Sequence, residues 1–126
     1  MTRRRVMGAL ASLLFAATPV LGAGDPGVIH KDSADASVVR GLIVFNTYCV
    51  LCHGARGEGN GRAARLYNPP PANLVSSQYN DDYKELIIRR GGEGVGRSAF
   101  MPPWGQQLTD EQIKDLVFYL RSIKRP

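Results

Sequence analysis

The sequence predicts a small all-α fold, and three observations support this fold class. Apolar residues recur every three to four positions in three segments, residues 37–48, 82–90 and 109–124. No segment shows the sustained alternation of apolar and polar residues that is typical of a half-buried strand. Long segments rich in Gly and Pro separate the helical ones. We therefore expect about three to four helices joined by long loops.

The N-terminal segment is typical of a secretory signal. Residues 3–5 are arginines, residues 6–21 form an apolar run, and small residues at 22–24 offer a cleavage site. The run is shorter than the roughly 20 apolar residues that a membrane-spanning helix needs. We therefore predict that residues 1–24 are a signal peptide and that the mature chain is periplasmic. An uncleaved membrane anchor is the alternative.

Removing this segment changes the charge of the chain. The formal net charge falls from +5 to +2, because three arginines and no acidic residue leave with residues 1–24. A basic excess that belongs partly to a targeting segment gives no reason to expect a nucleic-acid partner. Residues 25–36 show no apolar period and are predicted to be a flexible leader, so the folded domain is expected over residues 37–126.

The first helix is predicted from Ser37 to Tyr48. Residues three to four positions apart share one helix face, and the predicted buried face consists of Val38, Leu42, Phe45 and Cys49. Residues 54–71 then contain too many helix breakers for regular structure and are predicted to be a long loop.

A second helix is predicted from Asp82 to Arg90. Asn80 or Asp81 is expected to cap its N-terminus, and the Gly91-Gly92 pair is expected to end it. A second loop rich in Gly and Pro spans residues 91–107.

The last helix has the strongest sequence signals. Thr109 and Gln112 have the spacing of a capping box, and Asp110 and Glu111 suit the positive end of the helix dipole. An apolar stripe at helical spacing marks the face that packs on the core. It consists of Ile113, Leu116, Val117, Leu120 and Ile123.

One short motif carries specific chemistry. Residues 49–53, Cys-Val-Leu-Cys-His, match the C-x-x-C-H pattern of c-type haem attachment. Two thiols three positions apart at a helix end can each form a thioether with a vinyl group on the same edge of a porphyrin. The adjacent imidazole then lies under the iron. The motif predicts one covalently attached haem c, bonded to Cys49 and Cys52, with His53 as an iron ligand.

A disulfide, a zinc site and a thioredoxin-like redox pair are the alternatives. A structural zinc site needs four ligands, whereas the predicted mature chain offers two Cys, the adjacent His53 and the remote His30. A thioredoxin-like pair is expected after a strand in a βαβ unit, and here the motif follows a predicted helix. The export signal directs the cysteines to the compartment where haem c is attached, which favours haem.

Met101 is the only methionine outside the predicted signal. A lone methionine usually fills a gap in a core, but this one lies in a loop, where Pro102 and Pro103 restrict the backbone. A thioether that is held rigidly suits iron, so we predict Met101 as the second axial ligand, with His30 as the other candidate. A Met/His pair raises the reduction potential and leaves no open position for a substrate.

Other residues are candidates for contacts around the haem. The free nitrogen of a haem-bound histidine usually donates to a carbonyl or carboxylate, and Pro69–Pro71 could stiffen such a carbonyl; simple loop stiffening is the alternative. The two haem propionates need donors. The candidates are Arg89, Arg90, Arg97 and Trp104, with solvated surface as the alternative for each arginine.

These motifs resemble those of a known family, the class I c-type cytochromes. The resemblance covers residues 37–124, with Gly41-x-x-x-Phe45, the haem motif, residues 69–74, residues 101–105 and the last helix in the family's order. It implies the class I cytochrome c fold around one haem, with Met101 as the distal ligand. It also implies a close helix crossing at Gly41, where Phe45 and Tyr119 pack. The family's simplest forms place a proline soon after the haem motif, whereas here the prolines come later.

We therefore expect a monomeric one-electron shuttle, not an enzyme, that docks briefly with redox proteins of the dehydrogenase or oxidase type. Arg56, Arg62 and Arg65 could attract acidic partners, with ordinary solvated charge as the alternative. A haem enzyme or gas sensor with a labile distal ligand is one rival function. A bound cytochrome subunit of a larger oxidoreductase is the other.

Overall fold

The computed structural model describes residues 29–125, so the predicted signal peptide and most of the predicted leader lie outside it. Within this range the chain forms four α-helices and two short 3-10 turns, and no strand. The elements are α1 (Ala34–Tyr48), α2 (Val50–His53), η1 (Ala64–Leu66), α3 (Asp81–Arg90), η2 (Glu93–Val95) and α4 (Asp110–Ser122). The predicted all-α fold is confirmed. No helix of the described residues is long and apolar enough to cross a membrane.

Helix α1 begins three residues earlier than the predicted start at Ser37. The Ser33 hydroxyl accepts a hydrogen bond from the Ala36 backbone N–H at 3.2 Å, which satisfies one of the free donors at the helix start. The last three residues of the predicted leader therefore belong to the folded domain.

The buried face of α1 differs from the predicted one. Gly41, Val44 and Phe45 are buried, whereas Leu42 lies at the edge of that face and is 37% exposed. The apolar period predicted a face that included Leu42, and this was wrong. The face is set by the position of α4, which packs directly on Gly41.

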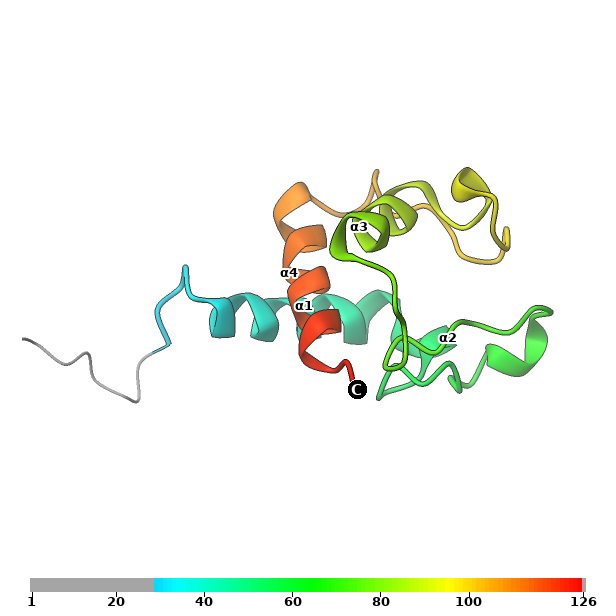
Figure 1. Cartoon of the computed structure of the whole chain (residues 1–126), viewed down its shortest axis with the longest axis horizontal. Helices are drawn as coiled ribbons and strands as arrows, with labels where there is room; N and C mark the ends of the chain where they lie inside the picture. Colours follow the sequence, from blue (N-terminus) through cyan, green and yellow to red (C-terminus); the bar gives the residue numbers. More distant parts are fainter. Residues whose placement is uncertain (1–28, 126) are drawn as a thin grey trace, which may run out of the picture.

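The crossing of α1 and α4 organises the fold. Figure 1 shows α4 crossing α1 near its middle, with α3 and its following loop on one side and α2 with its loop on the other. A Cβ atom at Gly41 would clash with the Asp115 carbonyl oxygen and lie 2.8 Å from Tyr119 Cβ. The rings of Phe45 and Tyr119 pack beside it with centroids 5.1 Å apart. The close crossing implied by the resemblance is confirmed.

An ion pair fixes the same crossing from its edge. The Asp115 carboxylate is buried, and Arg40 donates to it from Nε at 2.6 Å and from a terminal nitrogen at 3.0 Å. Hydrogen bonding to Asp115 is the main cause of the raised pKa of Arg40. Asp115 thus touches α1 twice, through its carbonyl against Gly41 and through its carboxylate on Arg40.

The other two long helices begin at the caps expected from the sequence. Asn80, and not Asp81, caps α3, because its side chain accepts from the Tyr83 N–H at 2.9 Å. Thr109 and Gln112 form the predicted capping box of α4, with reciprocal hydrogen bonds of 2.9 and 3.2 Å. Helices α1, α3 and α4 share one apolar core, which consists of Val44, Phe45, Ile88, Leu108, Ile113, Leu116, Val117, Tyr119 and Leu120.

We expect Gly41→Ala to destabilise the domain. In a free helix this change is stabilising by up to about 1 kcal/mol, but here the added methyl group must separate α1 from α4, which costs about 1–3 kcal/mol. Denaturant unfolding of the mature protein measures the difference. Asn46→Ala, on the exposed side of α1, is the matched control and should change stability by no more than about 0.5 kcal/mol. A stabilised Gly41→Ala protein would contradict the close crossing.

Candidate functional site: an apolar cavity with two thiols, an imidazole and a thioether

A cavity of about 420 Å³ lies between the end of α1, α3, α4 and the two long loops. Most of its lining is aliphatic or aromatic, and Phe45, Leu116 and Leu120 of the core form part of it. The cavity is therefore continuous with the crossing of α1 and α4. The same packing that holds these helices together shapes the wall of the site.

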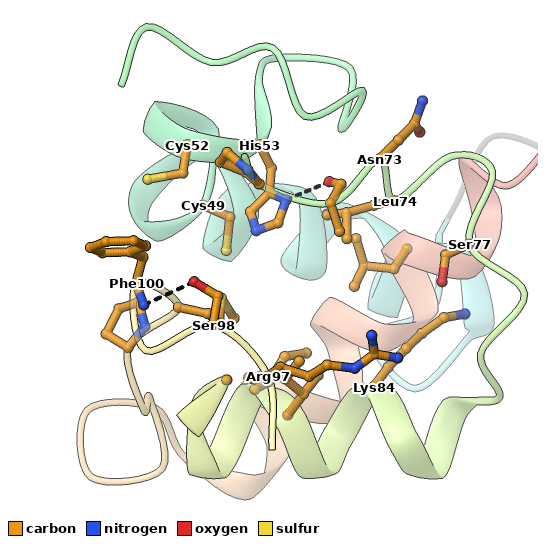
Figure 2. Close-up of a pocket in the computed structure, with 18 of the residues that line it drawn as sticks. Cys49, Cys52, His53, Asn73, Leu74, Ser77, Lys84, Arg97, Ser98 and Phe100 are labelled. Carbon is orange, nitrogen blue, oxygen red and sulfur yellow. Dashed lines mark hydrogen bonds between the residues drawn. The ribbon is translucent and has the colours of Figure 1, made fainter. Parts of the chain in front are cut away.

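Cys49 and Cys52 line this cavity together with His53 (Figure 2). Cys49 caps the end of α1, and α2 carries Cys52 and His53 for one further helical turn. The two cysteines are not joined by a disulfide. Before haem is attached, burial, with a smaller effect from the neighbouring Cys52, raises the pKa of the Cys49 thiol to about 12.

A backbone carbonyl fixes the orientation of His53. Its Nδ1 lies 2.9 Å from the Ala72 carbonyl oxygen. A carbonyl can only accept, so Nδ1 carries the proton and the lone pair of the neutral ring is on Nε2. Burial lowers the pKa of His53, and the bond to Ala72 opposes this effect. The arrangement is the usual one for a histidine that binds a metal through its other nitrogen.

Ala72 follows the proline segment from which the sequence predicted an acceptor. The carbonyl that His53 reaches is thus one residue beyond Pro71. The loop from residue 54 is folded tightly behind it: Gly59 has a φ of +79°, and a Cβ there would lie 2.5 Å from the Pro71 carbonyl oxygen. The Leu74 N–H also donates to the Gly57 carbonyl at 2.7 Å. The glycines of this loop allow it to support the Pro71–Ala72 backbone.

Met101 lines the same cavity from the loop between α3 and α4. Its backbone is held on both sides, because the Gly92 N–H donates to the Met101 carbonyl at 2.8 Å and the Met101 N–H donates to the Ser98 carbonyl at 3.3 Å. The structure therefore brings all four predicted site residues, Cys49, Cys52, His53 and Met101, into the lining of one cavity.

The predicted donors for haem propionates are placed differently from one another. Arg97 and Trp104 line the cavity. Arg89 instead pairs with Asp110 at 2.5 Å, a contact that is the main cause of its raised pKa, and Arg90 is an exposed residue outside the lining. For these two arginines, the predicted role is not supported by their position.

Lys84 also lines the site and was not predicted from the sequence. This lysine is only 9% exposed and lines the cavity from α3. The helical spacing could have indicated its burial. Lys84 precedes Ile88 by four positions and thus shares the face of α3 that carries the buried isoleucine. Lysines on a helix are usually solvated, and the apolar pattern alone gave no reason to place this one inside.

The lining is unusual in its charge. Lys84 and Arg97 are the charged side chains of the cavity wall, and no carboxylate of the described residues lines it. Lys84 is buried, whereas Arg97 lines the cavity but is exposed to solvent. Two cations beside an apolar cavity favour a ligand that brings negative charge. Lys84 does have one partner at the edge, Asp81, at 3.3 Å.

These features fit haem c. The cavity has the size of cofactor sites, which is about 300–1,000 Å³, and its wall is apolar enough for a porphyrin. An imidazole nitrogen and a thioether sulfur are iron ligands, two thiols can form the attachment, and two cations match two propionates. Fold and site together define a small haem-binding helical domain.

Comparison with known proteins specifies the family. The family model described as Cytochrome c matches residues 38–124, so the chain belongs to the cytochrome c family and carries covalently bound haem c. This range begins in α1 and ends just after α4, and thus includes the whole cavity.

Several relatives are similar over most of the described domain. The chain is 32% identical to the cbb3-type cytochrome c oxidase subunit CcoP of Azospirillum sp. over 75% of its own length, but spans only 32% of that subunit. It is 27% identical to cytochrome c-555 of Methylococcus capsulatus, over 93% of this chain and 75% of that protein. In fold it resembles a chain of the Kuenenia stuttgartiensis reducing HAO-like protein complex, with a TM-score of 0.62, 19% identity, and coverage of 82% of this chain and 50% of that one.

Proposed function

We propose that the protein is a monohaem electron-transfer protein that passes single electrons between periplasmic redox partners. In this proposal haem c is bonded to Cys49 and Cys52, and its iron is held by His53 and Met101. The observation that carries the proposal is that these four side chains line one apolar cavity. When bound, haem supplies a one-electron ferric/ferrous couple, and the protein supplies its ligands and surroundings.

The protein holds both proposed ligands by backbone hydrogen bonds. The Ala72 carbonyl orients the His53 ring, and the Gly92 N–H and Ser98 carbonyl position Met101. Ligands held this way need little rearrangement when one electron arrives or leaves. A thioether ligand also favours the ferrous state compared with harder ligands, and two protein ligands leave no position for a substrate.

The lining argues against a haem enzyme or gas sensor. Proton transfer to a substrate on a haem requires a positioned acid or base. Apart from His53, no histidine or carboxylate of residues 29–125 lines the cavity.

A bound subunit of a larger oxidoreductase is a second candidate function. It is favoured by the relatives, because several of them are named as subunits of an oxidase or a dehydrogenase. Native size measurement separates the two. A carrier elutes from periplasmic extract at the mass of the mature chain, whereas a subunit elutes with an oxidase or dehydrogenase.

The Met101 ligand has a direct spectroscopic test. We expect the ferric protein to show the weak long-wavelength charge-transfer band of a thioether on iron, and Met101→Ala to abolish it and allow CO to bind the ferrous haem. Phe100→Ala is the matched control, since the neighbouring ring lines the cavity without offering a sulfur. A wild-type protein that lacks the band and binds CO readily would refute the carrier proposal.

The proposed export has a test of its own. The mass of the mature N-terminus should correspond to cleavage near residues 22–24, because a signal peptidase selects small residues before the cut. A protein that retains residues 1–21 would instead be anchored in the membrane.

The surface near Cys52 is suited to an acidic partner. Leu51, Leu66 and Phe100 are 50%, 72% and 52% exposed, and Arg62 and Arg65 are exposed nearby in sequence. Arg56 pairs with Glu58 at 3.0 Å, so its charge is largely balanced and its predicted docking role is reduced. We propose that acidic redox proteins dock here, attracted by Arg62 and Arg65.

Electron exchange with ferrocyanide, a small anionic complex, tests whether Arg62 and Arg65 attract a negatively charged redox partner. We expect the rate to decrease with ionic strength and to fall several-fold in Arg62→Gln/Arg65→Gln, because a local positive potential concentrates anions near the surface. Arg56→Gln should have a smaller effect, since Glu58 already balances that charge. Equal rates in the wild type, the double variant and Arg56→Gln would place electron exchange at another surface.

A further inference from the structure

The two cations of the cavity wall belong to different parts of the fold. Lys84 lies on α3, whereas Arg97 lies in the loop that joins α3 to α4. Figure 2 shows both on the same wall, across the cavity from Cys49, Cys52 and His53. Two propionates facing this wall would therefore contact one residue of a rigid helix and one residue of a loop.

Arg97 is positioned but has no acidic partner among residues 29–125. Its Nε donates to the Tyr83 hydroxyl at 3.2 Å, and its guanidinium lies over the Tyr79 ring, 5.3 Å from the centroid. Its terminal nitrogens make no hydrogen bond with a described residue. Arg97 is exposed to solvent and also lines the cavity. A guanidinium offers five N–H donors, so the donors of Arg97 that are not bonded to Tyr83 can exchange water for an anion in the cavity.

Lys84 is held from outside the cavity. Its Nζ lies 3.3 Å from an Asp81 carboxylate oxygen, and the other oxygen of Asp81 bonds Arg121 on α4. Since Asp81 is the first residue of α3, these contacts fix the helix and not the loop.

Arg97 is coupled to Met101 through a single residue, Gly92. The Gly92 carbonyl accepts from the Arg97 N–H at 2.7 Å, and the Gly92 N–H donates to the Met101 carbonyl at 2.8 Å. Gly92 is buried and has no room for a side chain, because a Cβ atom there would clash with the Ser98 carbonyl oxygen. Two backbone hydrogen bonds thus connect Arg97 to Met101 through one buried residue.

We propose that Arg97 is a positioning residue: it binds a haem propionate and so fixes the loop that holds Met101 on the iron. Lys84 binds propionate as well but does not control the loop. The inference rests on the proposed His53/Met101 ligation. It gives the anionic edge of the haem a role in keeping the distal ligand in place.

The experiment compares Arg97→Gln, Lys84→Gln and Arg90→Gln in the loaded protein. Arg90→Gln is the matched control, because this substitution removes the same charge from an exposed position on α3 outside the cavity. Two quantities are measured in each protein. Resonance Raman bands of propionate bending report hydrogen bonds to propionate, and titration of the ferric protein with imidazole reports how readily Met101 is displaced, through loss of the thioether band.

We expect the propionate bands to shift in Arg97→Gln and Lys84→Gln and to be unchanged in Arg90→Gln. Imidazole should displace Met101 at a concentration about tenfold lower in Arg97→Gln only. Tenfold corresponds to about 1.4 kcal/mol, close to the contribution of one hydrogen bond to a charged group. If Arg97→Gln matches Arg90→Gln in the Raman bands, or matches Lys84→Gln in the imidazole titration, the proposal is wrong.

Two further variants keep the test decisive if Arg97→Gln assembles poorly. Arg97→Lys retains the charge and should keep the propionate bands near those of the wild type, with an intermediate imidazole titration. Tyr83→Phe removes only the hydroxyl that holds Arg97. An equal loss of Met101 in Tyr83→Phe with unchanged propionate bands would mean that α3, and not propionate, holds the loop. A wild-type protein without the thioether band would refute the ligation itself, whatever the Raman bands show.

Discussion

The close contact of α1 with α4 at Gly41 is the constraint on which the rest of the structure depends. Because position 41 carries no side chain, the two helices approach until Asp115 and Tyr119 touch the α1 backbone. Two turns beyond this contact, α1 ends at Tyr48 and Cys49 begins the site. The contact also places Leu116 and Leu120 of α4 in both the core and the cavity wall. The site is an extension of the helix crossing, and its geometry follows from the packing of two helices.

Local signals in the sequence were enough to predict the helices and the attachment motif. Caps such as Asn80 and Thr109 act within a few residues, so their effect can be read from neighbours in the chain. The exposure of Leu42 could not be predicted in this way, because the position of α4 decides which side of α1 is buried. The same limit applies to the site. The Ala72 carbonyl reaches His53 across 19 positions, and the burial of Lys84 depends on the whole cavity.

The two walls of the cavity have different chemistry. One wall carries the thiols and the imidazole, and the opposite wall carries the cations (Figure 2). The remaining lining is largely apolar, so the electrostatic effect of the buried Lys84 is stronger than it would be in water. A group with an apolar body and acidic substituents would be held best with its acidic side toward Lys84 and Arg97. The sequence contains both walls, but the thiols and the imidazole come from residues 49–53 and the cations from positions 84 and 97, so the walls meet only in the fold.

The loop that carries Met101 is tied at its base. The Trp104 and Gly105 N–H groups donate to the carbonyls of Ile88 and Arg89, at 2.9 and 3.2 Å, and the Gly92–Met101 bond closes the loop above them. The Arg97 N–H and the Gly92 carbonyl close the turn over residues 93–96. Extra residues within this turn would lengthen a closed surface loop without moving its ends, and the entropic cost of loop closure rises only slowly with length. Natural variation can therefore enter here by insertion and deletion. Over evolutionary time this segment is free to acquire new surfaces while the helices beneath it stay unchanged.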